Sequence, residues 1–390
     1  VSVLHTMDAD GSNIRCISPN TVHDFKPSVM PNGHFTFTRW EYVDKHLGNQ
    51  QSLWVCNPDG TRMNHVAGNH FGPVTYWEPF RVPGSRYFVC ILAPHMPLAC
   101  GPVALIDPVH TYASPAIYEN ITPELPPPTH FSWLRTDVGY YTYAYPLSEN
   151  YFIVSYNYGP DDRDPTGYGI YLLDRWNNRD LVYRDPELSC FEPIPVRSRP
   201  VPPVIAPRQG KATAVAETRP TEAPDGEEGG TGVFYVTDIY QGLPGIERGE
   251  VKYLRLIEEI PKPVSADCPG FAIQYPVISN RGHLAAKRLW GTVPVEADGS
   301  AHFTAPANKA IYFAALDERF MEIQRMRSFT MVSPGGRFGC VGCHEAKHTA
   351  PVNLNATALA RAPSEITPPP AGGVHAPDFC YDVQPVLDKH

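Results

Sequence analysis

Short runs of alternating apolar and polar residues fill the first half of the chain, and these runs recur. Residues 4–12 (LHTMDADGS) return in similar form at 53–61 (LWVCNPDGT). A second unit at 30–38 (MPNGHFTFT) returns at 82–90 and again at 145–154. Each unit places a turn before a strand, and Asp-Gly pairs favour the positive-φ turns of β-hairpins. Strand-turn-strand repeats of about 40–50 residues are typical of β-propeller blades.

The pattern predicts a mainly β chain whose first part, residues 1–192, is a partial β-propeller. Strands at 103–107 and 170–174 are expected to close blades, and the Pro- and Tyr-rich stretch 109–140 to be an insertion between blades. Three or four blades are recognisable, so we expect further blades ahead of residue 1. A plain β-sandwich is the alternative arrangement of such short strands.

Two Pro-rich stretches divide the remainder of the chain. Residues 193–207 are expected to be a stiff linker, followed by a β-rich middle domain over 208–361. Residues 362–390 hold a second Pro-rich linker and the first turns of a helix at 380–389. Alternating residues in the middle domain predict strands at 233–237, 251–256, 300–304 and 310–314, and a short helix is expected at 280–287.

The charge and composition of the chain narrow the function classes. The formal net charge is −9 and no long basic run is present, which argues against nucleic-acid binding. No apolar stretch reaches the roughly 20 residues that a membrane helix needs, so no membrane span is expected. The 43 prolines and 30 glycines fit many short strands joined by ordered loops.

One pair of the nine cysteines has the spacing of a cofactor site. Cys340-Val-Gly-Cys343-His344 fits the C-x-x-C-H motif of a covalently attached c-type haem, in which both thiols bond the haem vinyl groups and the His ligates the iron. The alternatives are a disulfide or half of a zinc site, and no second C-x-x-C completes such a site. Cys56 and Cys90 lie in apolar strand patterns and are expected to be buried core thiols.

Further metal ligands are sought among the histidines. His348 follows His344 by one helical turn and is a second candidate for the iron. His70 lies in an irregular Gly-rich loop, and His95 follows the end of a strand; both are candidate metal ligands. The Asp-rich turns at 8–10 and 161–164 are candidate calcium sites, with ordinary solvated turns as the alternative.

The haem region also carries a family resemblance. Residues 291–300 (GTVPVEADGS), 326–330 (MRSFT) and 339–345 (GCVGCHE), together with 76–78 and 83–85, resemble the hydrazine synthase alpha subunit family. The resemblance extends over nearly the whole chain. It implies a propeller, a middle domain with one c-type haem, and a C-terminal cytochrome c-like domain whose own motif would follow His390.

The resemblance also implies a particular set of metal ligands. In that family the motif His is drawn to a zinc ion, and a Tyr four residues later binds the iron. The matching residues here are His344 and His348, so a second His replaces the Tyr. A Cys that helps to bind the zinc is matched by His70, and His95 matches the region that gives the second haem its distal ligand.

Three functions are compatible with these features. The first is electron transfer or redox chemistry within a larger complex, with other redox subunits or cytochromes as partners in a homo- or hetero-oligomer. The second is a haem enzyme of small nitrogen compounds, which needs an open coordination position on the iron. The third is a docking propeller with an accessory haem. Since haem attachment takes place outside the cytoplasm, the cofactor implies the periplasm or an equivalent compartment, although no signal peptide is seen.

Overall fold

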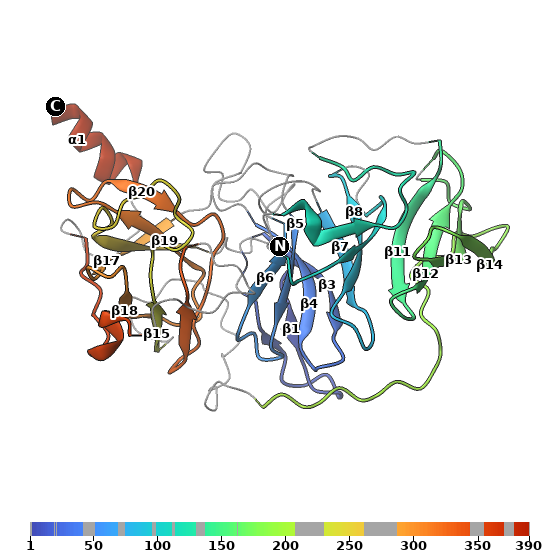
Figure 1. Ribbon diagram of the computed structural model, residues 1–390, viewed down its shortest axis with the longest axis horizontal. Helices are drawn as coiled ribbons and strands as arrows, with labels where there is room; N and C mark the ends of the chain where they lie inside the picture. Colours follow the sequence, from blue (N-terminus) through green and yellow to red (C-terminus); the bar gives the residue numbers. More distant parts are fainter. Residues whose placement is uncertain are drawn as a thin grey trace.

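A computed structural model describes most of the chain: residues 2–18, 20, 22–41, 51–68, 75–95, 99–110, 114–129, 137–161, 163–206, 230–260, 287–343, 355–369 and 378–389. The described residues form a mainly β molecule in two parts, as the sequence predicts (Figure 1). The first part contains a two-stranded hairpin, an eight-stranded sheet and a four-stranded sheet. The second contains a three-stranded and a four-stranded sheet.

The eight-stranded sheet consists of two four-stranded halves joined by one parallel pair, Gln51 with Thr75. These halves and the four-stranded sheet form three propeller-like blades, in which the strands follow one another in chain order. The first blade comprises β3 (His23–Val29), β4 (Phe35–Trp40), β5 (Gln51–Cys56) and β6 (Asn64–Ala67). The second comprises β7 (Thr75–Arg81), β8 (Phe88–Ala93), β9 (Val103–Ile106) and β10 (Tyr118–Asn120). The third comprises β11 (Tyr140–Pro146), β12 (Tyr151–Asn157), β13 (Tyr168–Asp174) and β14 (Arg179–Tyr183). A two-stranded hairpin, β1 (His5–Thr6) and β2 (Arg15–Cys16), precedes them.

The repeated Asp-Gly turns form as the sequence predicts. In the β5–β6 hairpin, Asp59 Oδ1 accepts hydrogen bonds from the backbone N and the hydroxyl of Thr61, at 3.0 and 2.6 Å. Asp10 binds Ser12 in the same way in the β1–β2 hairpin. Gly60 has a φ of +81°, which a residue with a side chain adopts only at a cost.

Two expectations about blade edges are wrong. β9 and β13 do not close their blades, because each pairs with a further strand, β10 and β14. Residues 118–120 therefore belong to the second blade instead of an insertion. These outer strands are short and largely exposed, so their sequences lack the apolar alternation by which strands are recognised.

The blades pack face to face through alternate residues of β8. Phe88 and Cys90 point into a core shared with Leu53 of the first blade. Val89 and Ile91 point the other way, into a core shared with the third blade. Successive side chains of a strand point to opposite faces of the sheet, so alternate residues of β8 pack against different blades. Cys56 and Cys90 are fully buried, which confirms them as core thiols.

The inner strands β3, β7 and β11 lie next to one another, and each carries a β-bulge. The bulges fall between Phe25 and Ser28 in β3 and between Trp77 and Phe80 in β7. A bulge re-aims the side chain that it contains. The bulges therefore set which residues of the inner strands meet between the blades.

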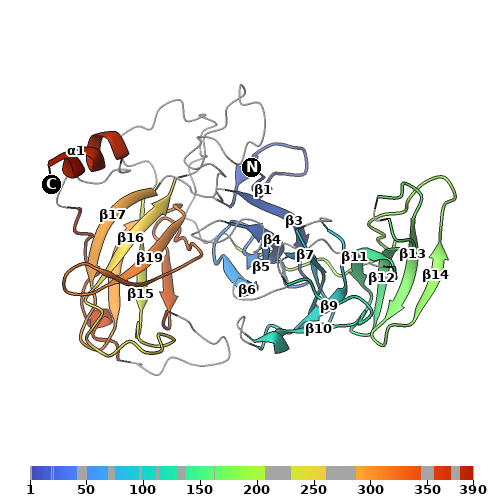
Figure 2. The ribbon, with the colours of Figure 1, turned by 90° about the horizontal axis from the view of Figure 1, so that it is seen from above.

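The second part consists of two sheets with strand orders β18-β15-β21 and β17-β16-β19-β20, at the opposite end of the molecule from β11–β14 (Figures 1 and 2). Its strands are β15 (Thr231–Val236), β16 (Tyr253–Glu259), β17 (Lys287–Pro294), β18 (Ala301–Pro306), β19 (Ile311–Leu316), β20 (Glu322–Arg325) and β21 (Arg337–Cys340). Phe234 lies in their common core, with its ring near those of Phe303, Phe313 and Phe338.

Helices are few. Two 3-10 turns span Pro115–Ile117 and Thr357–Ala360, and a π-helical turn, Phe379–Val383, runs into α1 (Gln384–Lys389). The last of these is the helix expected at 380–389. Of the helix expected at 280–287, all but the final residue lies outside the described residues, and Lys287 begins β17. No helix in the described ranges combines the length and apolarity needed to span a membrane.

Candidate functional site

The Cys340–Cys343 loop follows the last strand of the second part. β21 pairs in parallel with β15, which places Cys340 opposite Val236. The pairing continues past the strand, since the backbone N of Thr237 donates to the carbonyl of Cys340 at 3.0 Å. Val341 O accepts two further bonds, from the Thr237 hydroxyl at 2.9 Å and from Asp238 N at 3.1 Å. The loop is therefore clamped along its length by residues 237–238.

The glycines of the loop permit this close approach. A methyl group built on Gly342 would lie 2.3 Å from the carbonyl oxygen of Gln241. One built on Gly339 would lie 2.1 Å from the ring of Tyr235. Both contacts are far inside van der Waals range, and at Gly342 the clash is with backbone, so a side chain there requires the loop to shift.

The two thiols lie at the edge of the core of the second part. Cys340 and Cys343 are partly buried, form no disulfide, and pack against the cluster that contains Phe234. Burial raises the pKa of the Cys343 thiol to about 12. The surroundings of both thiols are apolar.

His95 is the one candidate ligand among the histidines singled out above that lies within the described residues. It follows β8 and meets Trp40, the last residue of β4, edge to face with ring centroids 5.7 Å apart. Trp40 stacks on His23 at 5.5 Å. Burial lowers the pKa of His95, which keeps its imidazole neutral, the form that binds a metal.

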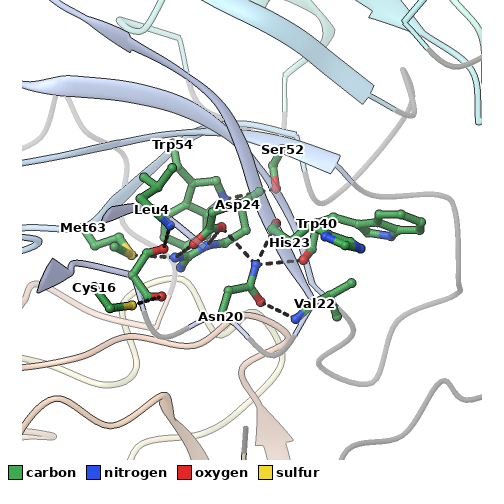
Figure 3. A network of polar contacts seen from close by, with 12 residues as sticks. Leu4, Cys16, Asn20, Val22, His23, Asp24, Trp40, Ser52, Trp54 and Met63 are labelled. Atoms are coloured by element: carbon green, nitrogen blue, oxygen red, sulfur yellow. Dashed lines mark hydrogen bonds and ion pairs between the residues drawn. The ribbon is translucent and has the colours of Figure 1, made fainter. Parts of the chain in front are cut away.

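A polar network fixes the backbone beneath these rings (Figure 3). Asn20 Nδ2 donates to the carbonyl oxygens of His23 and Trp40, at 2.8 and 2.9 Å. The same amide donates to Asp24 Oδ1 at 2.9 Å, and Asn20 Oδ1 accepts from Val22 N. One buried amide thus ties the end of β3 to the end of β4.

Asp24 also holds the fully buried Arg39. The guanidinium donates to both carboxylate oxygens, at 2.8 and 2.9 Å, and to the sulfur of Met63. Its carbon lies 4.6 Å from the ring of Trp54 on one blade and 4.5 Å from the ring of Phe329 in the second part. This cation therefore joins the two parts of the molecule.

The other predicted ligands are not all placed. His70, His344 and His348 lie outside the described residues. His95 belongs to a blade and the cysteines to the second part. Within those same ranges, no group of three or more His, Cys, Asp or Glu side chains is arranged to hold a metal.

The Asp-rich turns use their carboxylates internally. Asp10 accepts from Ser12 as described above, and Asp8 accepts from Asn13 at 2.5 Å. Asp161 and Asp164 accept from backbone N–H groups two residues further on, at 3.0 and 2.9 Å. These are turn-forming hydrogen bonds, which favour the solvated-turn alternative over calcium.

Comparison with known proteins points to one family. Residues 249–345, from just before β16 to just past the cysteine loop, match the model described as the hydrazine synthase alpha subunit middle domain. The hydrazine synthase subunit alpha of Kuenenia stuttgartiensis is 24% identical over 380 residues, covering 88% of this chain and 44% of the relative. This chain is similar to the hydrazine synthase alpha subunit.

The solved structure of Kuenenia stuttgartiensis hydrazine synthase supports the same fold. It matches with a TM-score of 0.70 and 20% identity, covering 96% of this chain and 56% of that one. The chain spans about half the length of these relatives. The resemblance to hydrazine synthase alpha subunits expected from residues 291–345 is thus confirmed, together with the mainly β, propeller-like fold.

Sequence reasoning missed a group of charged residues between the blades. Lys26 of β3, Glu78 of β7 and Glu192 meet there, although they are far apart in the chain. A signal was present: Phe25-Lys26-Pro27 and Trp77-Glu78-Pro79 are parallel triplets of aromatic residue, charged residue and proline. Each triplet marks a bulge of an inner strand.

Proposed function

We propose that this chain is the alpha-type subunit of a haem enzyme of small nitrogen compounds, similar to hydrazine synthase, with a c-type haem on Cys340 and Cys343. The observation that carries the proposal is the cysteine loop. It lies in the segment that matches the middle domain, it is clamped to β15, and its glycines leave room only for a closely packed backbone.

The residues present fit a covalent haem. Two cysteines that form no disulfide lie at the edge of one apolar core, and the residue that follows the second is His344. When bound, the haem would supply the redox chemistry at its iron. The protein would attach it through Cys340 and Cys343 and offer the imidazoles of His344 and His348 as ligands, with His70 a candidate for a zinc ion.

Electron transfer is the second candidate function. His348 stands where the relatives' pattern has a Tyr, so two imidazoles, from His344 and His348, compete for the iron. Imidazole ligands on both faces of the iron would leave no open position for a substrate and would favour electron transfer. The neutral His95 is a further candidate axial ligand, for a second haem.

Carbon monoxide separates the two candidates. We expect the reduced holoprotein to bind carbon monoxide with a change in its absorption spectrum, because an enzyme of this kind keeps a coordination position open. A low-spin spectrum that carbon monoxide leaves unchanged would favour electron transfer. Loss of covalent haem from the C340A/C343A variant is the control that the spectrum belongs to this site.

Partners and compartment follow from the same proposal. The relative is named as a subunit, so we propose that this chain also works in a hetero-oligomer with other redox subunits. Attachment of a c-type haem outside the cytoplasm makes the periplasm, or an equivalent compartment, the proposed location.

A further inference from the structure

Three charged residues with unusual backbone conformations meet where the segment after the third blade contacts the inner strands of the first and second blades. Lys26 has a φ of +54°, and Glu78 and Glu192 each have a φ of +50°. Residues other than glycine rarely adopt this left-handed conformation, and they persist in it where the surrounding structure demands it. Lys26 and Glu78 sit in the bulges of β3 and β7, which aim both side chains at the same point.

Glu192 belongs to a segment that crosses the blades, residues 184–206, here called the strap. The strap leaves β14 and runs beneath the blades without helix or strand, past the hairpin between β3 and β4 (Figure 1). At its start, Ser189 N donates to Pro165 O and Cys190 N to Tyr168 O, both at 2.9 Å. Further along, Arg199 lies over the ring of Tyr145, and Pro203 meets Gly33.

Glu192 connects the strap to the inner strand β3 through Lys26. Lys26 Nζ donates to Glu192 Oε1 at 2.7 Å and also binds Glu78 Oε1. Glu78 is only 5% exposed, and no described residue provides a hydrogen bond to its Oε2. Tyr143 of β11 lies nearby, also with its hydroxyl buried and without a partner among the described residues. Two carboxylates therefore share one ammonium group, with Glu78 buried and Glu192 on the exposed side of the cluster.

The surroundings of Glu78 favour its neutral form. Burial is the main reason that its pKa is raised to about 7, and the nearby Glu192 carboxylate adds to this, while Lys26 opposes it. The adjacent strand β8 is apolar throughout and contributes no charge. A protonated Glu78 can donate a hydrogen bond to Glu192, whereas an ionised Glu78 repels it.

We propose that Lys26, Glu78 and Glu192 form a proton-operated latch, in which a protonated Glu78 holds the strap against the blades and an ionised Glu78 loosens it. When the strap lifts, Glu78 gains water and its carboxylate is stabilised. The docked strap therefore binds the proton more tightly than the lifted strap does. By linkage, docking is strongest at low pH and weakens as the pH rises through the pKa of Glu78.

Hydrogen exchange tests the latch in the full chain. The reporter is a peptide containing the amides of Ser189 and Cys190, which lose their partners when the strap lifts. After correction for intrinsic rates, we expect exchange to rise by about tenfold between about pH 6 and about pH 8.5. E78Q, a neutral isostere, should keep the low-pH protection at both values. E119Q, which removes an exposed partner of Arg175 in an unrelated ion pair, should retain the wild-type dependence.

Each outcome bears on the latch. Exchange of the reporter that does not change with pH in the wild-type chain overturns the proposal, and this measurement needs no variant. An unaltered pH dependence in E78Q shows that another group titrates and overturns it as well. E192Q supports the proposal if it removes the pH dependence of the reporter's exchange, because no carboxylate then remains on the strap for an ionised Glu78 to repel, and overturns it if the wild-type pH dependence is kept.

Discussion

At the scale of single residues, the cysteine loop shows which features of a site a sequence motif predicts. The spacing of Cys340 and Cys343 and the adjacent His344 are evident from the sequence. The requirement for glycine at position 342 is not, because it arises from Gln241, a residue 101 positions earlier that the fold brings within contact. The sequence identifies the chemical groups of the loop, and tertiary contacts determine which side chains fit next to them.

A first prediction concerns Gly342. In G342A the new methyl group would overlap the backbone of Gln241, so the loop must shift away from residues 237–241. We expect a loss of about 1–3 kcal/mol in the free energy of unfolding, measured by urea denaturation, as for other overpacked sites. G159A is the control, since its methyl group would meet only the side chain of Asn157, at 3.3 Å. Equal losses in the two variants would contradict the proposed close approach.

A second prediction concerns thiol reactivity in protein prepared without haem. Burial raises the pKa of Cys343 to about 12, so its thiol is protonated at neutral pH and reacts slowly with alkylating reagents. Cys380 is exposed and should be modified first. Peptide mass spectrometry after a short treatment with iodoacetamide measures both rates. Faster modification of Cys343 than of Cys380 would show that the loop is open in solution.

At the scale of elements, the repeated hairpins are alike in sequence but not in surroundings. The β1–β2 and β5–β6 turns both use an Asp carboxylate to bind the residue two positions on, and both place glycine at a φ above +80°. A methyl group on Gly11 would meet nothing within 4 Å, whereas one on Gly60 would lie 2.2 Å from Ile17 O. The local turn is therefore set by sequence, and its packing by the neighbouring hairpin.

A third prediction uses this pair. G11A should cost about 1 kcal/mol, the usual penalty of a side chain at positive φ. G60A should cost about 1–3 kcal/mol more, because it adds a clash with Ile17. Thermal or chemical unfolding of both variants measures the difference. Equal costs would mean that the two hairpins do not pack as described.

At the scale of the whole molecule, one cation links the blades to the second part. Arg39 is buried between Trp54 and Phe329, and its charge is neutralised by Asp24. Phe329 follows β20 and precedes the strand that leads to Cys340. The contact therefore connects the first blade with the segment that carries the proposed haem. The sequence near Arg39 or near Phe329 does not predict this contact, because the two residues are 290 positions apart in the chain.

A fourth prediction follows for F329A. Removing a ring that is 2% exposed should cost about 3–5 kcal/mol. The substitution should also speed hydrogen exchange in β4, because the guanidinium of Arg39 is no longer covered by the ring of Phe329 and becomes accessible to water. F303A removes an equally buried ring from the second part, away from Arg39, and should destabilise that part without changing β4. Equal effects of both variants on β4 would exclude Phe329 as the specific link.

The sequence by itself determined the local features of this protein. Alternating residues predicted the strands of the blades and of the second part, Asp-Gly pairs predicted their turns, and the Cys340–Cys343 spacing predicted the candidate cofactor site. Each depends on residues close together in the chain. The tertiary structure alone decided the features made by distant residues, among them the outer strands β10 and β14, the Arg39–Phe329 contact and the meeting of Lys26, Glu78 and Glu192. Their physical cause is burial and charge pairing between segments whose separation in sequence carries no signal of their contact.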